Sequence, residues 1–198
     1  VLGWCLEFRR VLFRSADEIG MTVNFIDDDG YVYVRRLGGT NPAITRAQRV
    51  IVHSGKGPVK GVVGSVAPHL MRTDTGVPKV PKIHELFIDI GADSRKAAEK
   101  LVRVGDPITL NDQFEVLRDD LVVARAFDNR VGTWAVAETL RLLKTGKAKL
   151  NAEVCALANT MEQVALLGAR PIAYSLHPHV APVRHVPHPP PHPPPPPP

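Results

Sequence analysis

The chain has 198 residues, of which 44% are hydrophobic and 23% are charged, and its formal net charge is +5. This length and composition are typical of one globular domain or two small ones. The basic residues are scattered among acidic ones, and no run of about 18 apolar residues occurs, which argues against binding to nucleic acid and against a membrane span.

The two ends of the chain depart from that average composition. Residues 1–15 show neither a helical nor a strand period, and residues 10–15 can be encoded by a common sequencing-adapter end. We therefore interpret 1–15 as a foreign or artefactual segment that packs poorly or adventitiously. Residues 187–198 are almost all proline, which lacks the N–H that helices and sheets need, and they are predicted to be a disordered tail.

Histidines are interspersed with the prolines towards the carboxyl end. A metal-binding or polyproline II segment is the less favoured interpretation, and a departure from the reading frame near Leu176 is the favoured one. The two cysteines, Cys5 and Cys155, are too far apart in the sequence to suggest a zinc knuckle or a disulfide framework. Reduced thiols in a cytoplasmic protein explain them best.

Short β-prone runs dominate residues 21–118, which are predicted to form a small, mainly β domain. Two hairpins are indicated, the first around the Asp-Gly turn at 27–30 and the second around 54–57. Asp93 or Ser94 is a candidate cap for a short helix that ends near Leu101. The expected strands are residues 21–26, 31–34, 50–53, 59–63, 86–90 and 108–110.

The hydrophobic period changes near residue 119, and residues 119–186 are predicted to alternate strands and helices. This alternation favours an α/β layer with a parallel-rich sheet. Asn129 is a candidate N-cap for a helix that ends near Thr145 and carries apolar side chains on one face. The nearly all-apolar run 152–158 is typical of a strand buried on both faces. The apolar positions of this first helix are Val136, Leu140 and Leu143. The other expected strands are residues 121–126 and 180–186, and a second helix is expected at 168–176.

Acidic residues stand close to strand positions at three separate places in the chain. Asp17 precedes the first β run, Asp128 follows the strand candidate 121–126, and Glu162 follows the apolar strand candidate. Sites in open α/β sheets assemble at the carboxyl ends of strands, so these carboxylates could converge. On this pattern alone, a solvated acidic residue at a strand end is the commoner explanation.

Five short segments stand in a consistent order along the chain: 16–20 (ADEIG), 86–92 (LFIDIGA), 105–107 (GDP), 124–132 (ARAFDNRVG) and 160–169 (TMEQVALLGA). Together they resemble the glutamyl and tetrahedral (TET) aminopeptidase family of two-metal peptidases. Members of this family also carry names such as deblocking aminopeptidase and endoglucanase-like protein (cellulase M), although no carboxylate pair here is placed for glycoside hydrolysis. The resemblance implies a partial catalytic α/β domain, residues 16–20 and 119–186, interrupted by a β-rich dimerisation domain at 21–118.

The resemblance also implies roles for three acidic residues. Asp128 corresponds to the ligand that bridges two divalent ions, which are zinc, cobalt or manganese in such enzymes. Glu162 corresponds to the general base, and Asp17 to the aspartate that orients a histidine ligand. The implied reaction is hydrolysis of N-terminal residues from peptides by a homo-oligomeric, cytoplasmic enzyme.

Three ligand positions of the family are altered in this chain. Ser15 stands where the resemblance places a histidine, Gln163 stands where it places a carboxylate, and His185 falls near the position of an aspartate. Because these losses leave Asp128 as the one ligand intact by type, we expect the chain as written to be inactive. The alternatives are a non-catalytic, degenerate homologue or an assembly artefact that retains only the oligomerising β domain.

Overall fold

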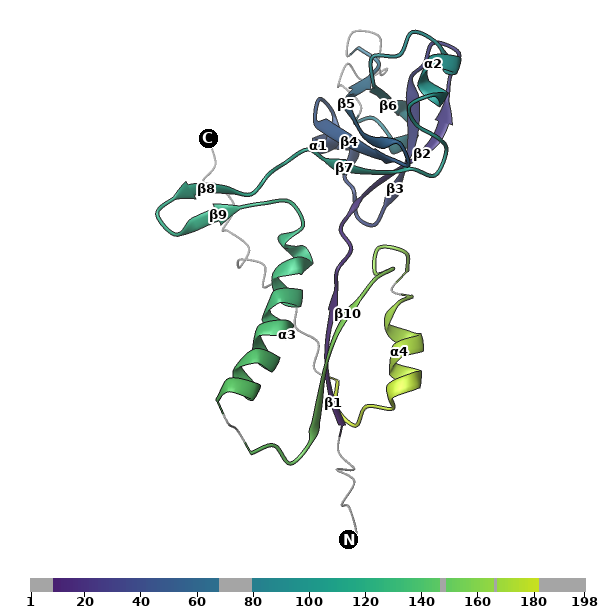
Figure 1. Cartoon of the computed structure of the whole chain (residues 1–198). Helices are drawn as coiled ribbons and strands as arrows, with labels where there is room; N and C mark the ends of the chain where they lie inside the picture. The colour runs from purple at the N-terminus through teal and green to yellow at the C-terminus, as the bar shows by residue number, and fades with distance from the viewer. Residues whose placement is uncertain (1–8, 68–79, 147–148, 166, 182–198) are drawn as a thin grey trace, which may run out of the picture. The chain divides into compact units, whose positions relative to one another are not determined.

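The computed structural model describes residues 9–67, 80–146, 149–165 and 167–181 (Figure 1). The chain divides into two units. The barrel unit consists of residues 18–125 and 163–165, and the sheet unit consists of residues 9–17, 126–162 and 167–181 among those described. In the described part of the chain, no helix is long and apolar enough to cross a membrane.

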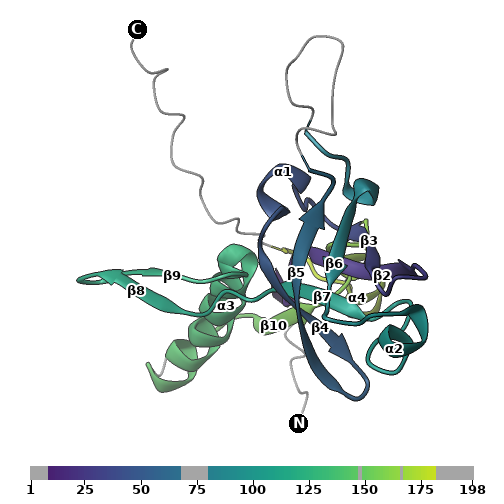
Figure 2. The same ribbon diagram turned by 90° about the horizontal axis from the view of Figure 1, so that it is seen from above.

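The barrel unit is built around six strands that close into a barrel in the order β2-β3-β6-β5-β4-β7 (Figures 1 and 2). Each neighbouring pair is antiparallel, and β2–β3 and β4–β5 are the two predicted hairpins. All six strands expected between residues 21 and 118 are therefore present, and their closure leaves the barrel without a free edge. The strands are β2 (Gly20–Ile26), β3 (Val32–Leu37), β4 (Arg49–Ser54), β5 (Gly57–Ser65), β6 (Leu86–Asp89) and β7 (Pro107–Leu110).

The turn of the first hairpin is closed by the side chain that precedes it. Asp27 Oδ1 accepts a hydrogen bond from Tyr31 N at 2.8 Å, and Asp27 N donates to Tyr31 O at 3.0 Å. Gly30 has a φ of 90°, a conformation that L side chains rarely adopt. The Asp-Gly pair therefore explains locally why the chain reverses here.

Alternate residues of the barrel strands point inward and form one apolar core. β-branched side chains dominate it, because they fit the pleated surface of a closed sheet. Full burial of each larger side chain contributes about 1.5–3 kcal/mol. The core residues are Met21, Val23, Ile26, Val32, Val34, Val50, Val52, Val63, Leu86, Ile88, Ala98, Val102 and Ile108.

Short helical segments connect the barrel strands: α1 (Pro42–Thr45), the 3-10 turn η2 (Ile83–Glu85) and α2 (Arg95–Glu99). Of the two predicted caps of α2, Ser94 is the one that acts, since its hydroxyl accepts from Ala97 N at 3.4 Å. The helix ends before the expected Leu101, and Ala98 on its inner face joins the core.

A separate hairpin follows the barrel strands. β8 (Glu115–Arg118) pairs antiparallel with β9 (Leu121–Val123), and every residue of both strands is exposed. The strand predicted at 121–126 is therefore shorter than expected and does not join the parallel sheet. Asp119, with a φ of 53°, allows a two-residue connection that pairs β9 with its immediate predecessor.

The sheet unit contains the parallel pair β1 (Arg9–Ser15) and β10 (Glu153–Asn159), with helices α3 (Phe127–Thr145) and α4 (Ala169–Leu176). Residues 1–15 are expected to pack poorly or adventitiously. Poor packing is wrong for β1, which pairs along its whole length with β10 and buries Val11 completely. Arg14 interrupts the apolar pattern in the sequence, yet its side chain is only 5% exposed.

The expectation that β10 is buried on both faces is also wrong for the described residues, since most of the strand is half-buried and only Asn159 is fully buried. The described sheet has only two strands, and α3 packs on both of them (Figure 1). The helices predicted at 129–145 and 168–176 are confirmed. Of the strand predicted at 180–186, Val180 forms an isolated bridge to Arg10, and residues 182–198 lie outside the described residues.

Candidate active site at the ends of β1 and β10

The carboxyl ends of the two parallel strands meet at one edge of the sheet unit. Ser15 is in register with Asn159, and Ala16 N donates a hydrogen bond to Asn159 O at 2.7 Å. Asp17 follows directly after Ala16, just beyond the end of β1. Glu162 lies three residues after Asn159, the last residue of β10. The topology therefore carries the segments of both acidic residues to the edge where α/β sheets assemble sites.

The first turns of α3 reach the same edge. Arg130 Nε donates to Ala16 O at 3.2 Å, and Thr133 Oγ1 donates to Ser15 O at 3.0 Å. Asp128 and Asn129 have non-helical backbone angles, and a cis peptide bond joins them. Asp128 thus lies in the bend that precedes the regular turns of α3.

The N-cap predicted at Asn129 is present at this bend. The helix assignment begins at Phe127, with Ala126 as its formal cap, but Asn129 Oδ1 accepts from Gly132 N at 3.1 Å. This is the bond of an N-cap side chain to the third amide of a helix that begins at Arg130. The cap explains why the regular helix begins two residues after Asp128.

The segment after β10 folds back on itself. Leu167 N donates to Met161 O at 3.1 Å, and a side chain at Gly168 would overlap the Thr160 carbonyl oxygen. A residue without a Cβ is therefore required where this turn closes. Glu162 lies inside the closed turn, which limits the positions that its backbone can take.

One polar residue at this edge was not singled out from the sequence. Asn159 is 7% exposed, and its buried Oδ1 has no hydrogen-bond partner among the described residues. An asparagine at the end of an apolar strand carries no motif signal, so only the fold identifies it. A buried acceptor of this kind is costly unless something pairs with it.

Three positions are related to metal ligands by the resemblance alone. Ser15 is 8% exposed in the sheet unit. Gln163 belongs to the barrel unit, where its side chain lies directly against Gly38 and close to Ile19. His185 lies outside the described residues.

Within the part of the chain that the structure describes, no group of three or more His, Cys, Asp or Glu side chains is placed to hold a metal ion. Asp17, Asp128 and Glu162 therefore do not form such a group by themselves. Their convergence on one reaction centre stays a prediction.

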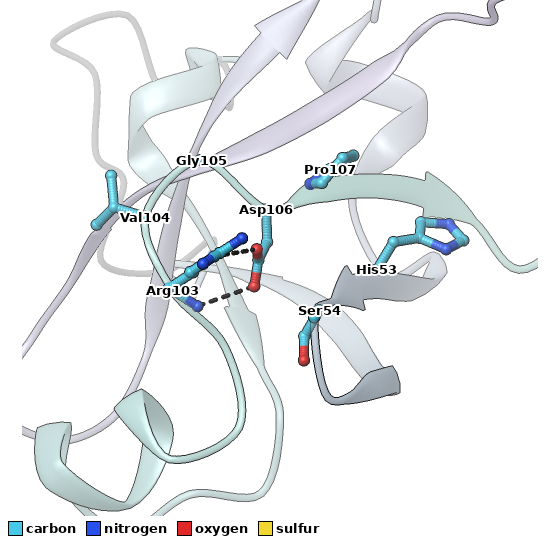
Figure 3. Close-up of a pocket in the computed structure, with 8 residues that line it drawn as sticks. His53, Ser54, Arg103, Val104, Gly105, Asp106 and Pro107 are labelled. Carbon is cyan, nitrogen blue, oxygen red and sulfur yellow. Dashed lines mark hydrogen bonds and ion pairs between the residues drawn. The ribbon is translucent and has the colours of Figure 1, made fainter.

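The barrel unit has a separate depression of about 560 Å³ beside the Gly-Asp-Pro segment (Figure 3). Asp106, 4% exposed, accepts hydrogen bonds from Arg103 N at 2.9 Å and Arg103 Nε at 3.3 Å. Its backbone oxygen accepts from Val23 N at 3.0 Å. These bonds close the turn into β7 and occupy the carboxylate, so this segment has a structural role.

Comparisons with known proteins show which family the chain belongs to. Residues 7–185 match the family model described as M42 glutamyl aminopeptidase. The chain belongs to the M42 glutamyl aminopeptidase family. The match includes β1, and it begins before the first segment that the sequence analysis related to this family.

M42 relatives agree in sequence and in fold. The chain is 32% identical over 165 residues to the lysyl aminopeptidase of Pyrococcus furiosus, covering 83% of this chain and 46% of that protein. It is similar to the TET aminopeptidase of Thaumarchaeota archaeon SCGC AB-539-E09, with a TM-score of 0.85 and 34% identity, over 90% of this chain and 51% of that one. The chain spans about half the length of the curated relatives it matches.

A further similar structure is described together with its assembly. The TET1 peptidase of Pyrococcus horikoshii, described as assembling into a tetrahedron or a large octahedral shell, is 30% identical with a TM-score of 0.79. The similarity covers 90% of this chain and 53% of that one. The mixed architecture of a parallel strand pair and an antiparallel barrel is thus that of TET aminopeptidases.

Proposed function

We propose that the whole protein is a metal-dependent aminopeptidase that removes N-terminal residues from peptides, and that the 198 residues by themselves are not catalytic. The observation that carries the first part is the family match, which runs through both acidic segments of the sheet unit. Glu162 is the proposed proton acceptor, Asp128 the proposed bridging ligand, and Asp17 the proposed orienting aspartate.

The residues present do not fit a two-ion centre. A catalytic zinc takes about three protein ligands plus water. Ser15 offers a neutral hydroxyl and Gln163 a neutral amide, neither of which offsets the repulsion between two dications. Gln163 lies against Gly38 in the barrel unit, and the described residues contain no metal-holding group. We therefore expect that this chain as it stands does not hold a pair of zinc, cobalt or manganese ions.

Assembly and location belong to the same proposal. The relatives that form large shells support a homo-oligomer, with the barrel unit as its dimerisation domain. The two widely separated cysteines and the family membership support a cytoplasmic protein. A peptide with a free N-terminus is the expected substrate.

Hydrolysis of aminoacyl-anilides by the purified chain, with added zinc, cobalt or manganese, tests the proposed inactivity. We expect no turnover above a Glu162→Gln control, because the proton acceptor has no activated water to act on. The double variant Ser15→His/Gln163→Glu is expected to stay inactive as well, because it restores two ligands only. Metal-dependent turnover that Glu162→Gln abolishes would show that the chain holds a working centre.

A chain of the relatives' full length tests the positive half of the proposal. We expect a chimera that adds the unmatched half of the Pyrococcus furiosus relative to this chain, with Ser15→His, Gln163→Glu and His185→Asp, to hydrolyse lysyl-anilide. A folded chimera that binds metal but cleaves no aminoacyl-anilide would count against aminopeptidase activity.

A further inference from the structure

Two charged residues in the matched segments have no role in the proposed chemistry. Glu18 follows Asp17, and Arg125 precedes Asp128 by three residues. They are also the residues at which the chain enters and leaves the main part of the barrel unit. Because each residue is close in sequence to one of the proposed site aspartates, both could influence the position of that aspartate.

Glu18 and Arg125 form a partly buried ion pair. Arg125 Nε lies 3.1 Å from Glu18 Oε2, and the side chains of Arg125 and Glu18 are 26% and 12% exposed. Arg125 Nη1 also donates to Asp112 O at 3.2 Å, so its planar fork has two partners. Removal of either side chain would take away a charge-assisted hydrogen bond from the other.

Two further hydrogen bonds join the same chain segments within the sheet unit. Arg130 donates to Ala16 O, and Thr133 donates to Ser15 O. The two segments are therefore joined once in the barrel unit and twice in the sheet unit. Asp17 lies between the joined residues on one segment, and Asp128 lies between them on the other.

We propose that the Glu18–Arg125 ion pair is a positioning device that registers residues 15–18 against residues 125–133 and so fixes the backbone that carries Asp17 and Asp128. The inference rests on the proposed function, since it takes these two aspartates to be working residues of the site. Glu18 and Arg125 act through their neighbours and contact no reacting atom.

Amide hydrogen exchange on the full chain tests this proposal. Two backbone amides report on the two segments: Ala16 N, which bonds to Asn159 O, and Arg130 N, which bonds to Ala126 O. In Glu18→Gln and in Arg125→Gln we expect both amides to exchange about tenfold faster, because each variant removes the charge-assisted hydrogen bond that joins the two segments. The reversed pair Glu18→Arg/Arg125→Glu is expected to return both rates to within about twofold of the original.

A matched control lies at the other end of β2. Asp28→Asn also removes the carboxylate partner of an arginine, Arg95, at 3.0 Å, but from a position that is 94% exposed. It should leave both amides unchanged. If Glu18→Gln fails to fold, Arg125→Lys can replace it. This variant keeps the positive charge but lacks the planar guanidinium group, and it should accelerate exchange of the same two amides by a smaller factor.

Three outcomes would overturn the proposal: unchanged rates in both single variants, an equal acceleration at the barrel amides such as Val23, or failure of the reversed pair to restore the rates. Equal acceleration throughout would mean a general loss of stability, which a urea unfolding curve measures independently. None of these readouts involves hydrolysis, so failure here leaves the aminopeptidase assay to be judged separately.

Discussion

The barrel unit and the sheet unit bury different kinds of side chain. The barrel closes its own hydrogen-bond ladder and surrounds thirteen buried apolar residues, and its short helices add to the same core. In the described sheet unit, Val11 is the one fully buried apolar side chain, and the other buried residues are Arg14, Ser15, Asn129 and Asn159.

This difference leads us to expect that the two units differ in stability. A closed sheet with a continuous apolar core can fold without help, whereas two parallel strands with a polar edge normally need cover on both faces. Apolar side chains on the described sheet unit are correspondingly exposed, among them Trp134 at 66% and Tyr174 at 79%. The barrel is thus expected to be the independent folding unit, and the site segments the dependent one.

Excision of the barrel gives the largest expected effect. We expect residues 18–125 alone to give dispersed amide resonances and a single cooperative urea transition, because the core lies within them. Residues 126–181 alone should give neither, since they lack β1. A disordered barrel fragment would contradict the comparison between the two units.

Truncation of a core side chain should be the next largest effect. Leu86→Ala is expected to lower the free energy of unfolding of the barrel by about 3 kcal/mol, because Leu86 is fully buried and leaves a cavity. Leu117→Ala, at a leucine that is 66% exposed on β8, should change it by less than about 0.5 kcal/mol. Equal losses in urea denaturation would show that the barrel core is not what stabilises the unit.

A smaller effect is expected in the sheet unit. Gly168→Ala should destabilise the turn after β10 by about 1–3 kcal/mol, because its methyl group would overlap the Thr160 carbonyl oxygen. Gly39→Ala in the barrel unit has open space around the new methyl group and serves as the control. Faster amide exchange in β10 with an unchanged barrel transition is the expected result, and a shifted barrel transition would mean that the units unfold together.

The smallest effect concerns pH. Burial raises the pKa of Tyr33, and the charges of Asp27 and Asp29 raise it further. A phenol with a raised pKa in the folded state contributes stability that is present below its ordinary pKa of about 10 and is lost as the pH rises through the raised value.

We therefore expect the free energy of unfolding of the barrel to fall above about pH 10, and Tyr33→Phe to flatten that fall. Tyr174→Phe, which removes an exposed phenol from α4, should leave the alkaline fall unchanged. The measurement is a urea transition at several alkaline pH values. An identical fall in Tyr33→Phe would assign the alkaline effect to other groups.

The sequence by itself predicted features that depend on interactions between residues close together in the chain. The Asp27–Gly30 turn predicted the first hairpin, and Ser94 and Asn129 were recognised as caps because a cap acts within three residues of its own position. The identities of Ser15 and Gln163 likewise led to the prediction that two metal ligands of the family are replaced. Each of these inferences needed only neighbours in the chain.

Tertiary structure alone decided the rest, because the decisive partners are far apart in the sequence. β1 was not recognised as a strand, since its pattern includes Arg14 and its partner β10 begins at Glu153. The Glu18–Arg125 pair joins residues 107 positions apart. A periodicity in one segment carries no information on which other segment pairs with it, and the closure of the barrel and the edge at which the site segments meet both depend on such pairings.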